Sequence, residues 1–266
     1  MNVIVTAGGE TDAKQPLYQV THGGLKAMIE ICGKPMVQWV LDALGETDQL
    51  ERVVVVGLPP ETDLTCKHPL ILLPDHGDML KNIMAGAKEV TRVDPQASHV
   101  LLASGDLPGL NGKMIEWFLE QVKDLNQDLY YTIIQRETME SQFPASKRTY
   151  IHLKDMQICG GDLHCFRLAA ATDESPIWKR LIESRKNPFR QASIVGYDTL
   201  LFLMLRQLNL QDAVKAVTRR LDIQGRAVPS PFAEMGMDVD KPFQLEIIRE
   251  YLSRRQEKHA AEAEQG

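Results

Sequence analysis

The stretch His99-Val100-Leu101-Leu102-Ala103 runs directly into Ser104-Gly105-Asp106-Leu107-Pro108, and this transition is the most informative in the chain. The apolar run predicts a buried strand, and the proline ends it. Asp106 then follows the carboxyl end of the strand, which is where open α/β sheets bind their ligands. A carboxylate at this place suits a Mg²⁺ ion, but it suits an Asx turn that caps the strand equally well. These ten residues alone leave both roles open.

Short apolar runs alternate with amphipathic segments on both sides of this stretch. The apolar runs predict strands at residues 2–6, 52–57, 70–73, 99–103 and 130–134. Helical spacing predicts helices over residues 35–44, 79–90 and 113–125, and a final helix from 241 to about 255. This order is that of successive β-α-β units, so the fold class is α/β, with a parallel sheet covered on both faces.

After residue 135 the pattern changes. A polar connector over residues 142–148 is followed by a predicted β-hairpin across 150–166 and by helical patterns over 176–220. We interpret this region as an insertion on the sheet that forms a substrate lid. Residues beyond the final helix are rich in Glu and Ala and are expected to fray.

Composition restricts the partners of the chain. Its 266 residues carry a formal net charge of −6 and no clustered basic stretch, which argues against nucleic-acid binding. The four cysteines (Cys32, Cys66, Cys159 and Cys165) show neither a CxxC pair nor zinc-ligand spacing, as expected of reduced thiols in the cytoplasm. No signal sequence and no run of eighteen apolar residues occur, so we expect no membrane partner.

The first strand leads into Thr6-Ala7-Gly8-Gly9, a glycine pair that lets backbone amides approach a phosphate. The spacing matches neither the dinucleotide-binding fingerprint, which makes a dehydrogenase improbable, nor a Walker loop. A long polar loop follows, then Lys26, and then Gly33-Lys34-Pro35-Met36, a tight turn with Pro35 at a helix start.

Together these motifs resemble the nucleotidyltransferase superfamily with the glycosyltransferase-A type fold, specifically the MobA-like NTP transferases and the sugar-phosphate nucleotidylyltransferases. The matching stretches stand in family order: Ala7-Gly8-Gly9, Lys26, Gly33-Lys34-Pro35-Met36, Gly105-Asp106-Leu107-Pro108 and Met237-Asp238-Val239-Asp240-Lys241-Pro242. The resemblance implies a Rossmann-like, mixed, mostly parallel β-sheet of about seven strands, flanked by helices, with a smaller acceptor-binding lid subdomain.

On this basis we expect a single MobA-like NTP transferase domain over residues 1–266. Its parts are a nucleotide-binding half at 1–135, an acceptor-binding or lid region at 136–232, a C-terminal metal strand and helix at 233–256, and a tail at 257–266.

The implied reaction moves a nucleoside monophosphate from CTP, GTP, UTP or dTTP to a phosphorylated small molecule, such as a sugar phosphate, and releases pyrophosphate. Mg²⁺ is the implied cofactor, with Asp106 and Asp240 as its ligands and Asp238 in reserve. Taken alone, Asp240 would more often cap the helix that follows it. Lys26 would add a cation to the triphosphate, and the amides of Ala7, Gly8 and Gly9 would cradle it. A solvated loop lysine is the alternative for Lys26.

Base and acceptor recognition are assigned to two further segments. Asn82, which follows the loop from Pro74 to Asp78, matches the polar residue with which the family binds the nucleotide base, although it also suits a first helical turn. The residues expected at the acceptor are Lys147, Arg148, Gly161 and Asp162. Basic pairs such as the first two are more often simply exposed.

One departure from the family pattern concerns the glycine loop. Many members have an Arg where this chain has Glu10 and Asp12, and two acids there would repel a triphosphate. The sequence therefore keeps a second hypothesis open, that of a noncatalytic nucleotide-binding relative. It also leaves the base, the acceptor and homo-oligomer formation undecided.

Overall fold

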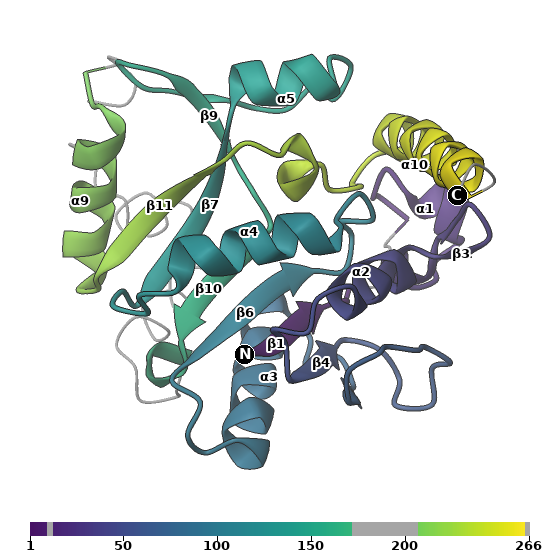
Figure 1. Ribbon diagram of the computed structural model, residues 1–266, viewed down its shortest axis with the longest axis horizontal. Helices are drawn as coiled ribbons and strands as arrows, with labels where there is room; N and C mark the ends of the chain where they lie inside the picture. Colours follow the sequence, from purple (N-terminus) through teal and green to yellow (C-terminus); the bar gives the residue numbers. More distant parts are fainter. Residues whose placement is uncertain (10–12, 172–206, 264–266) are drawn as a thin grey trace.

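The computed structural model describes residues 1–9, 13–171 and 207–263, and every structural statement below concerns these ranges (Figure 1). Its main sheet has nine strands, eight of them in the order β5-β4-β1-β6-β10-β7-β9-β8, while β11 pairs with β7. The strands are β1 (Asn2–Thr6), β4 (Arg52–Val56), β5 (Leu70–Leu73), β6 (His99–Ser104), β7 (Leu129–Gln135), β8 (Ile151–His152), β9 (Gln157–Gly160), β10 (Leu163–Arg167) and β11 (Gly225–Ser230).

Strands β5, β4, β1 and β6 form a parallel block. In register, Val3 of β1 lies between Val53 of β4 and Leu101 of β6, and all three side chains are fully buried. Burial on both faces explains why these strands are nearly continuous in Val, Ile and Leu. The parallel register also brings the carboxyl ends of β1 and β6 side by side.

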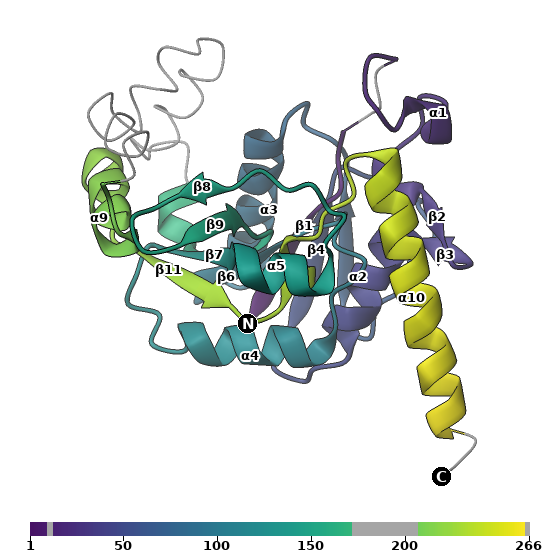
Figure 2. The same ribbon diagram turned by 90° about the horizontal axis from the view of Figure 1, so that it is seen from above.

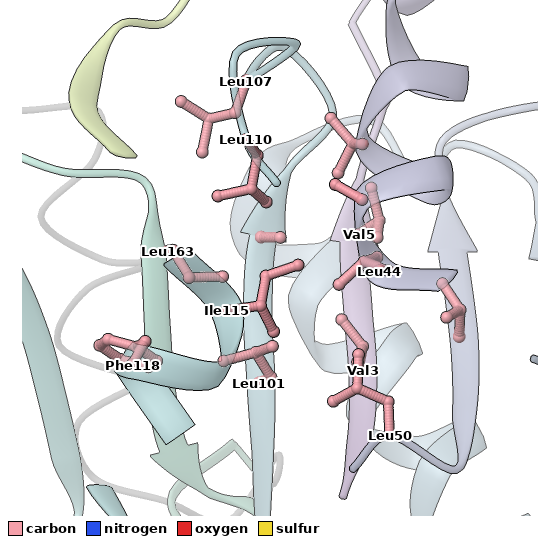
Figure 3. Packing of buried hydrophobic residues seen from close by; sticks show 14 of the residues in the cluster. Val3, Val5, Leu44, Leu50, Leu101, Leu107, Leu110, Ile115, Phe118 and Leu163 are labelled. Carbon is pink, nitrogen blue, oxygen red and sulfur yellow. The ribbon is translucent and has the colours of Figure 1, made fainter. Parts of the chain in front are cut away.

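The α-helices of the described residues are α1 (Tyr18–Thr21), α2 (Met36–Gly45), α3 (Met79–Val93), α4 (Gly112–Val122), α5 (Arg136–Gln142), α9 (Leu210–Leu221) and α10 (Pro242–Ala263). Several of them cover the two faces of the sheet. Leu44 of α2 and Phe118 of α4 pack with Val3 on one face (Figure 3). On the other face, Ile83 of α3 packs with Ile4. Figure 2 shows α3 across the sheet from α2 and α4, so the α/β expectation is confirmed.

Helix α10 packs beside the sheet rather than on it. Its Leu245, Ile248 and Leu252 share a buried cluster with Trp39 of α2 and Met139 of α5. The helix continues to Ala263, so the first part of the expected frayed tail is helical because Ala, Glu and Lys favour helix. None of the helices described is both long and apolar enough to cross a membrane.

The second half of the sheet differs from the expectation in three ways. The hairpin over 150–166 consists of β8 and β9 alone, because β10 leaves it and inserts antiparallel between β6 and β7. Strand β11 was missed because Gly225 and Pro229 disfavour strand, and with it the sheet has nine strands rather than about seven. Part of the polar connector forms α5. Of the helical patterns over 176–220, residues 176–206 lie outside the described ranges.

The described residues also differ from the expected C-terminal metal strand. Residues 233–236 form a 3-10 helix, and Met237 to Asp240 form an irregular segment that leads into α10. Its residues are fixed by tertiary contacts, since the Val239 amide donates to the carbonyl of Asp106 over 3.2 Å.

Candidate functional site

A pocket opens where the carboxyl ends of β1 and β6 meet. Its cavity volume is 310 Å³, within the range of small-ligand sites. The Gly105 amide donates to the Thr6 carbonyl over 2.8 Å and so joins the two strand ends. The lining residues are Thr6, Ala7, Gly8, Gly9, Lys26, Ala27, Asp75, Gly77, Asp78, Met79, Asn82, Ser104, Gly105 and Asp106. Every nucleotide-binding residue expected from the sequence therefore lines this one pocket.

The backbone of the Ala7-Gly8-Gly9 loop passes very close to Gly57. A Cβ added to Gly57 would lie 2.1 Å from the backbone nitrogen of Gly8, and Gly57 has a φ of +113°. A Cβ on Gly8 would lie 2.5 Å from the side-chain nitrogen of Asn82. Only glycine fits both positions, which keeps the backbone of the loop open toward the pocket.

Asn82 holds the loop that precedes α3. Its side-chain oxygen accepts from the His76 amide over 2.8 Å, and its side-chain nitrogen donates to Asp75 over 2.7 Å. The side chain of Asn82 is almost completely buried. Asp75, which sequence reasoning did not single out, is thereby fixed at the pocket. Its place in the Pro74–Asp78 loop was the only signal that could have found it.

Lys26 lies between two of the carboxylates that the sequence places far apart. Its Nζ donates to Asp106 Oδ2 over 2.6 Å and to Asp240 Oδ1. Burial by itself would lower the pKa of the Lys26 ammonium, but the negative charges of Asp106 and Asp240 outweigh that effect and raise it. Lys26 is therefore a charged, paired lysine and not a solvated loop residue.

Three carboxylates converge at this point. One oxygen each from Asp106, Asp238 and Asp240 lies within 4.8 Å of the others. Asp106 Oδ1 is buried and has no hydrogen-bond partner among the described residues. A buried carboxylate oxygen without a partner is costly unless a ligand satisfies it. The oxygen set and the unsatisfied atom together fit a hard divalent cation such as Mg²⁺.

The turn-capping alternatives for two of these residues find no support in the contacts. Asp240 accepts from Lys26 with its side chain, while the contact it makes to α10 is from its backbone amide to the Gln244 side chain, over 3.0 Å. The only side-chain hydrogen bond described for Asp106 is to Lys26.

The four residues expected at the acceptor separate into two groups. Arg148 donates to Asp238, and burial, reinforced by the charge of Asp106, raises the pKa of the Asp162 carboxyl to about 7. Arg148 and Asp162 therefore belong to the same electrostatic cluster as the three carboxylates. Gly161 packs behind it, with a Cβ position 2.7 Å from Thr132, and Lys147 lies over the ring of Phe243 at 5.4 Å. Glu10 and Asp12 lie outside the described residues.

Comparison with known proteins finds a matching family model and two relatives. The model of the MobA-like NTP transferase domain matches residues 4–222. The bifunctional protein GlmU of Priestia megaterium is 44% identical over 55 residues, which are 21% of this chain and 71% of that protein. GlmU of Listeria innocua is 31% identical over 114 residues, 41% of this chain and only 20% of that protein.

Among solved structures, a hypothetical transferase from Thermus thermophilus superposes with a TM-score of 0.77 at 34% identity. The match covers 92% of this chain and 98% of that one. Its fold is therefore shared over nearly the whole length of the chain.

Proposed function

The chain belongs to the MobA-like NTP transferase family, and on that premise we propose that it transfers a nucleoside monophosphate from a nucleoside triphosphate to a phosphorylated small molecule. The observation that carries the proposal is the unsatisfied Asp106 Oδ1 beside Asp238, Asp240 and Lys26, at the mouth of a pocket walled by Gly8. Two polyanions must meet in this reaction, so the site has to supply positive charge.

Asp106 and Asp240 would hold a Mg²⁺ ion, with Asp238 next to them. When bound, this ion would supply positive charge that offsets the charge of the phosphates and of the leaving pyrophosphate. Arg148 neutralises Asp238, which leaves Asp106 and Asp240 as the two carboxylates whose described cation partner is Lys26. The charge pattern thus favours the pair that the family resemblance implies.

Lys26 supplies the second cation of the site. Its ammonium hydrogen-bonds both carboxylates and lines the pocket, so a short displacement of Nζ would let it donate to a triphosphate oxygen. The backbone of Ala7, Gly8 and Gly9 lies along the same wall and can bind phosphate and sugar through amides.

Asp75 gives the pocket an acceptor for a nucleotide base. One of its oxygens accepts from Asn82, and the carboxylate keeps further acceptor positions toward the cavity it lines. Guanine presents two adjacent N–H donors, which match a carboxylate better than the single donor sites of the other bases. We therefore extend the proposal to GTP as the preferred donor.

The acceptor would enter from the side of Arg148 and Asp162. Arg148 is a cation suited to an acceptor phosphate, and burial, which raises the pKa of the Asp162 carboxyl to about 7, allows this carboxyl to be neutral near physiological pH. A neutral Asp162 would reduce repulsion against an incoming phosphate. A cytoplasmic location of the protein remains a prediction.

The test is pyrophosphate release with GTP, CTP, UTP, dTTP and ATP in Mg²⁺, each against a panel of sugar phosphates. We expect release with one triphosphate in the presence of one acceptor class, and loss of at least about a hundredfold in Asp106→Asn. Asp48→Asn is the matched control, because the Asp48 side chain is 90% exposed and is not among the residues that line the pocket. Silence with every pair, combined with a triphosphate-dependent rise in melting temperature, would contradict transfer and favour the noncatalytic relative.

A further inference from the structure

A second cleft lies away from the candidate site, where α10, the segment after α5 and the start of α4 meet. Its volume is 750 Å³, larger than the pocket at Gly8 and within the size of small-molecule sites. Figure 2 shows α10 along one side of the molecule with α5 next to it. None of the residues that line this cleft lines the first pocket.

The lining of this cleft is strongly basic in an acidic protein. Four cations line it, namely Lys113 of α4 and Arg254, Arg255 and Lys258 of α10, whereas its only acid is Glu250. Glu250 pairs with Arg254 over 2.5 Å. The chain as a whole carries a net charge of −6, so this concentration of positive charge is local and not a general property of the surface.

Lys113 lies at a helix position that disfavours a lysine. It lies in the first turn of α4, whose N-cap Asn111 accepts from the Met114 amide over 3.1 Å. The amino end of a helix carries partial positive charge, which repels a lysine and attracts an anion. Lys113 makes no ion pair among the described residues to offset this. A residue that opposes a local preference without compensation points to a functional role.

The lining of the cleft also includes apolar residues. They are Pro144 and Ala145 from the segment after α5 and Ile247 of α10. A ligand that combines a phosphate with an apolar or ring portion could contact both the cations and these residues.

Helix α10, which lines the cleft, is connected to both segments that carry the candidate metal ligands. Arg255 donates to the carbonyls of Gly109 and Leu110, over 3.4 and 3.1 Å, in the segment that follows Asp106. At its other end, α10 begins two residues after Asp240. A ligand in the cleft would thus contact α10, which is connected to both segments, without entering the candidate site.

We propose that this cleft is a second binding site, which takes a phosphorylated small molecule with its phosphate between Lys113, Arg254 and Lys258 and its apolar part against Ile247. The inference does not rest on the transfer reaction. It requires only binding, and it holds whether or not the chain releases pyrophosphate.

The test is isothermal titration of the full chain with inorganic tripolyphosphate in EDTA, where no metal is present. We expect the double variant Lys113→Gln/Arg254→Gln to lose the cleft component of binding, with affinity reduced by roughly tenfold or more. The control is Lys67→Gln/Arg92→Gln, which removes one exposed lysine and one exposed arginine, each already paired with an acid elsewhere. Any binding of tripolyphosphate at Lys26 is the same in the natural chain, the cleft variant and the control variant, so it does not affect the comparison of their affinities.

Three results would overturn the proposal: no binding by the natural chain, equal affinity in the cleft variant, or an equal loss in the control variant, which would indicate only general charge attraction. All four substituted side chains are exposed, so the variants are expected to fold. Unchanged melting temperatures without ligand check this. Because the assay involves no turnover, its outcome is separate from that of the pyrophosphate assay.

Discussion

Replacement of Lys26 by methionine tests the charge arrangement of the candidate site most directly. Met keeps the apolar stem of the side chain and removes the ammonium that lies 2.6 Å from Asp106 and also contacts Asp240. The variant leaves Asp106 and Asp240 without their described cation partner. Two properties should then change in opposite directions: the stability of the metal-free protein and its affinity for Mg²⁺.

The magnitude follows from burial. A unit charge pair about 4 Å apart is worth about 4 kcal/mol at an effective dielectric constant of 20, before the cost of desolvation is subtracted. The side chains of Lys26 and Asp106 are 21% and 18% exposed, but Asp240 is 57% exposed, so solvent screens its share. We therefore expect Lys26→Met to lower the free energy of unfolding in EDTA by about 2 kcal/mol, or roughly 5 °C in melting temperature.

Mg²⁺ without nucleotide should recover most of this loss, because the divalent ion no longer competes with the ammonium for the same oxygens. The Mg²⁺ affinity of the variant should therefore rise, while its affinity for the Mg²⁺-triphosphate falls. Thermal unfolding in EDTA and in increasing Mg²⁺, followed by titration with the triphosphate, measures all three quantities.

Lys34→Met is the matched control. Lys34 pairs with Asp42 and lies over the ring of Trp39, but the charged partners are 32% and 39% exposed and lie outside the pocket lining. We expect a loss of at most about 1 kcal/mol and no change in Mg²⁺ affinity. The reasoning is refuted if Lys26→Met binds Mg²⁺ more weakly than the natural chain, or if its stability in EDTA is unchanged.

Three further predictions concern single positions. The variant Gly57→Ala places a Cβ 2.1 Å from the Gly8 nitrogen, so it should lower the free energy of unfolding by more than about 2 kcal/mol. It should also abolish the triphosphate-dependent rise in melting temperature. A normal rise would show that triphosphate binding does not need the close approach of Gly57 to Gly8. Asp75→Asn should remove the preference for GTP over the other triphosphates in that assay, and an equal preference in variant and natural chain would rule out base recognition by Asp75. Burial lowers the pKa of the His164 imidazole to about 4, whereas its pKa in the unfolded chain is about 6.5. As the pH falls below about 6.5, the unfolded chain therefore binds a proton that the folded chain does not yet bind. The free energy of unfolding should decline by about 1.4 kcal/mol per pH unit down to pH 4. His164→Gln, which keeps an acceptor for the Thr132 amide, should flatten that decline when urea unfolding is measured from pH 7 to pH 4; an unchanged slope would assign the proton to another group.

Sequence patterns were most informative where a structural feature depends on neighbouring residues. The continuous apolar runs of β1, β4 and β6 predict a buried parallel block, because only strands that are covered on both faces are apolar throughout. This prediction needs no information from more distant parts of the chain. Short motifs whose backbone conformation depends on their own residues can likewise be recognised without the tertiary structure. Examples are Ala7-Gly8-Gly9 and Gly105-Asp106-Leu107-Pro108. The α/β class was predicted for these reasons, whereas the mixed sheet was implied by the family resemblance.

Contacts between distant segments could not be read in this way. Strand β10 enters the centre of the sheet because it pairs with both β6 and β7, a choice made by tertiary pairing and not by its own composition. The same holds for β11, whose glycine and proline argue against strand. The role of Asp75 depends on its hydrogen bond to Asn82, and the basic cleft depends on α10 lying beside the start of α4.

The sequence by itself indicated the residues that we propose carry the chemistry: a glycine pair after the first strand, Lys26, Asp106 and Asp240. Only the tertiary structure decided how they act together, because Lys26 is 80 residues from Asp106 and 214 from Asp240 along the chain. Parallel pairing of β1 with β6 and the contact of Val239 with Asp106 bring these residues to one point. There the balance of burial and charge, and not residue type alone, leaves Asp106 Oδ1 unsatisfied and pairs Asp238 with Arg148.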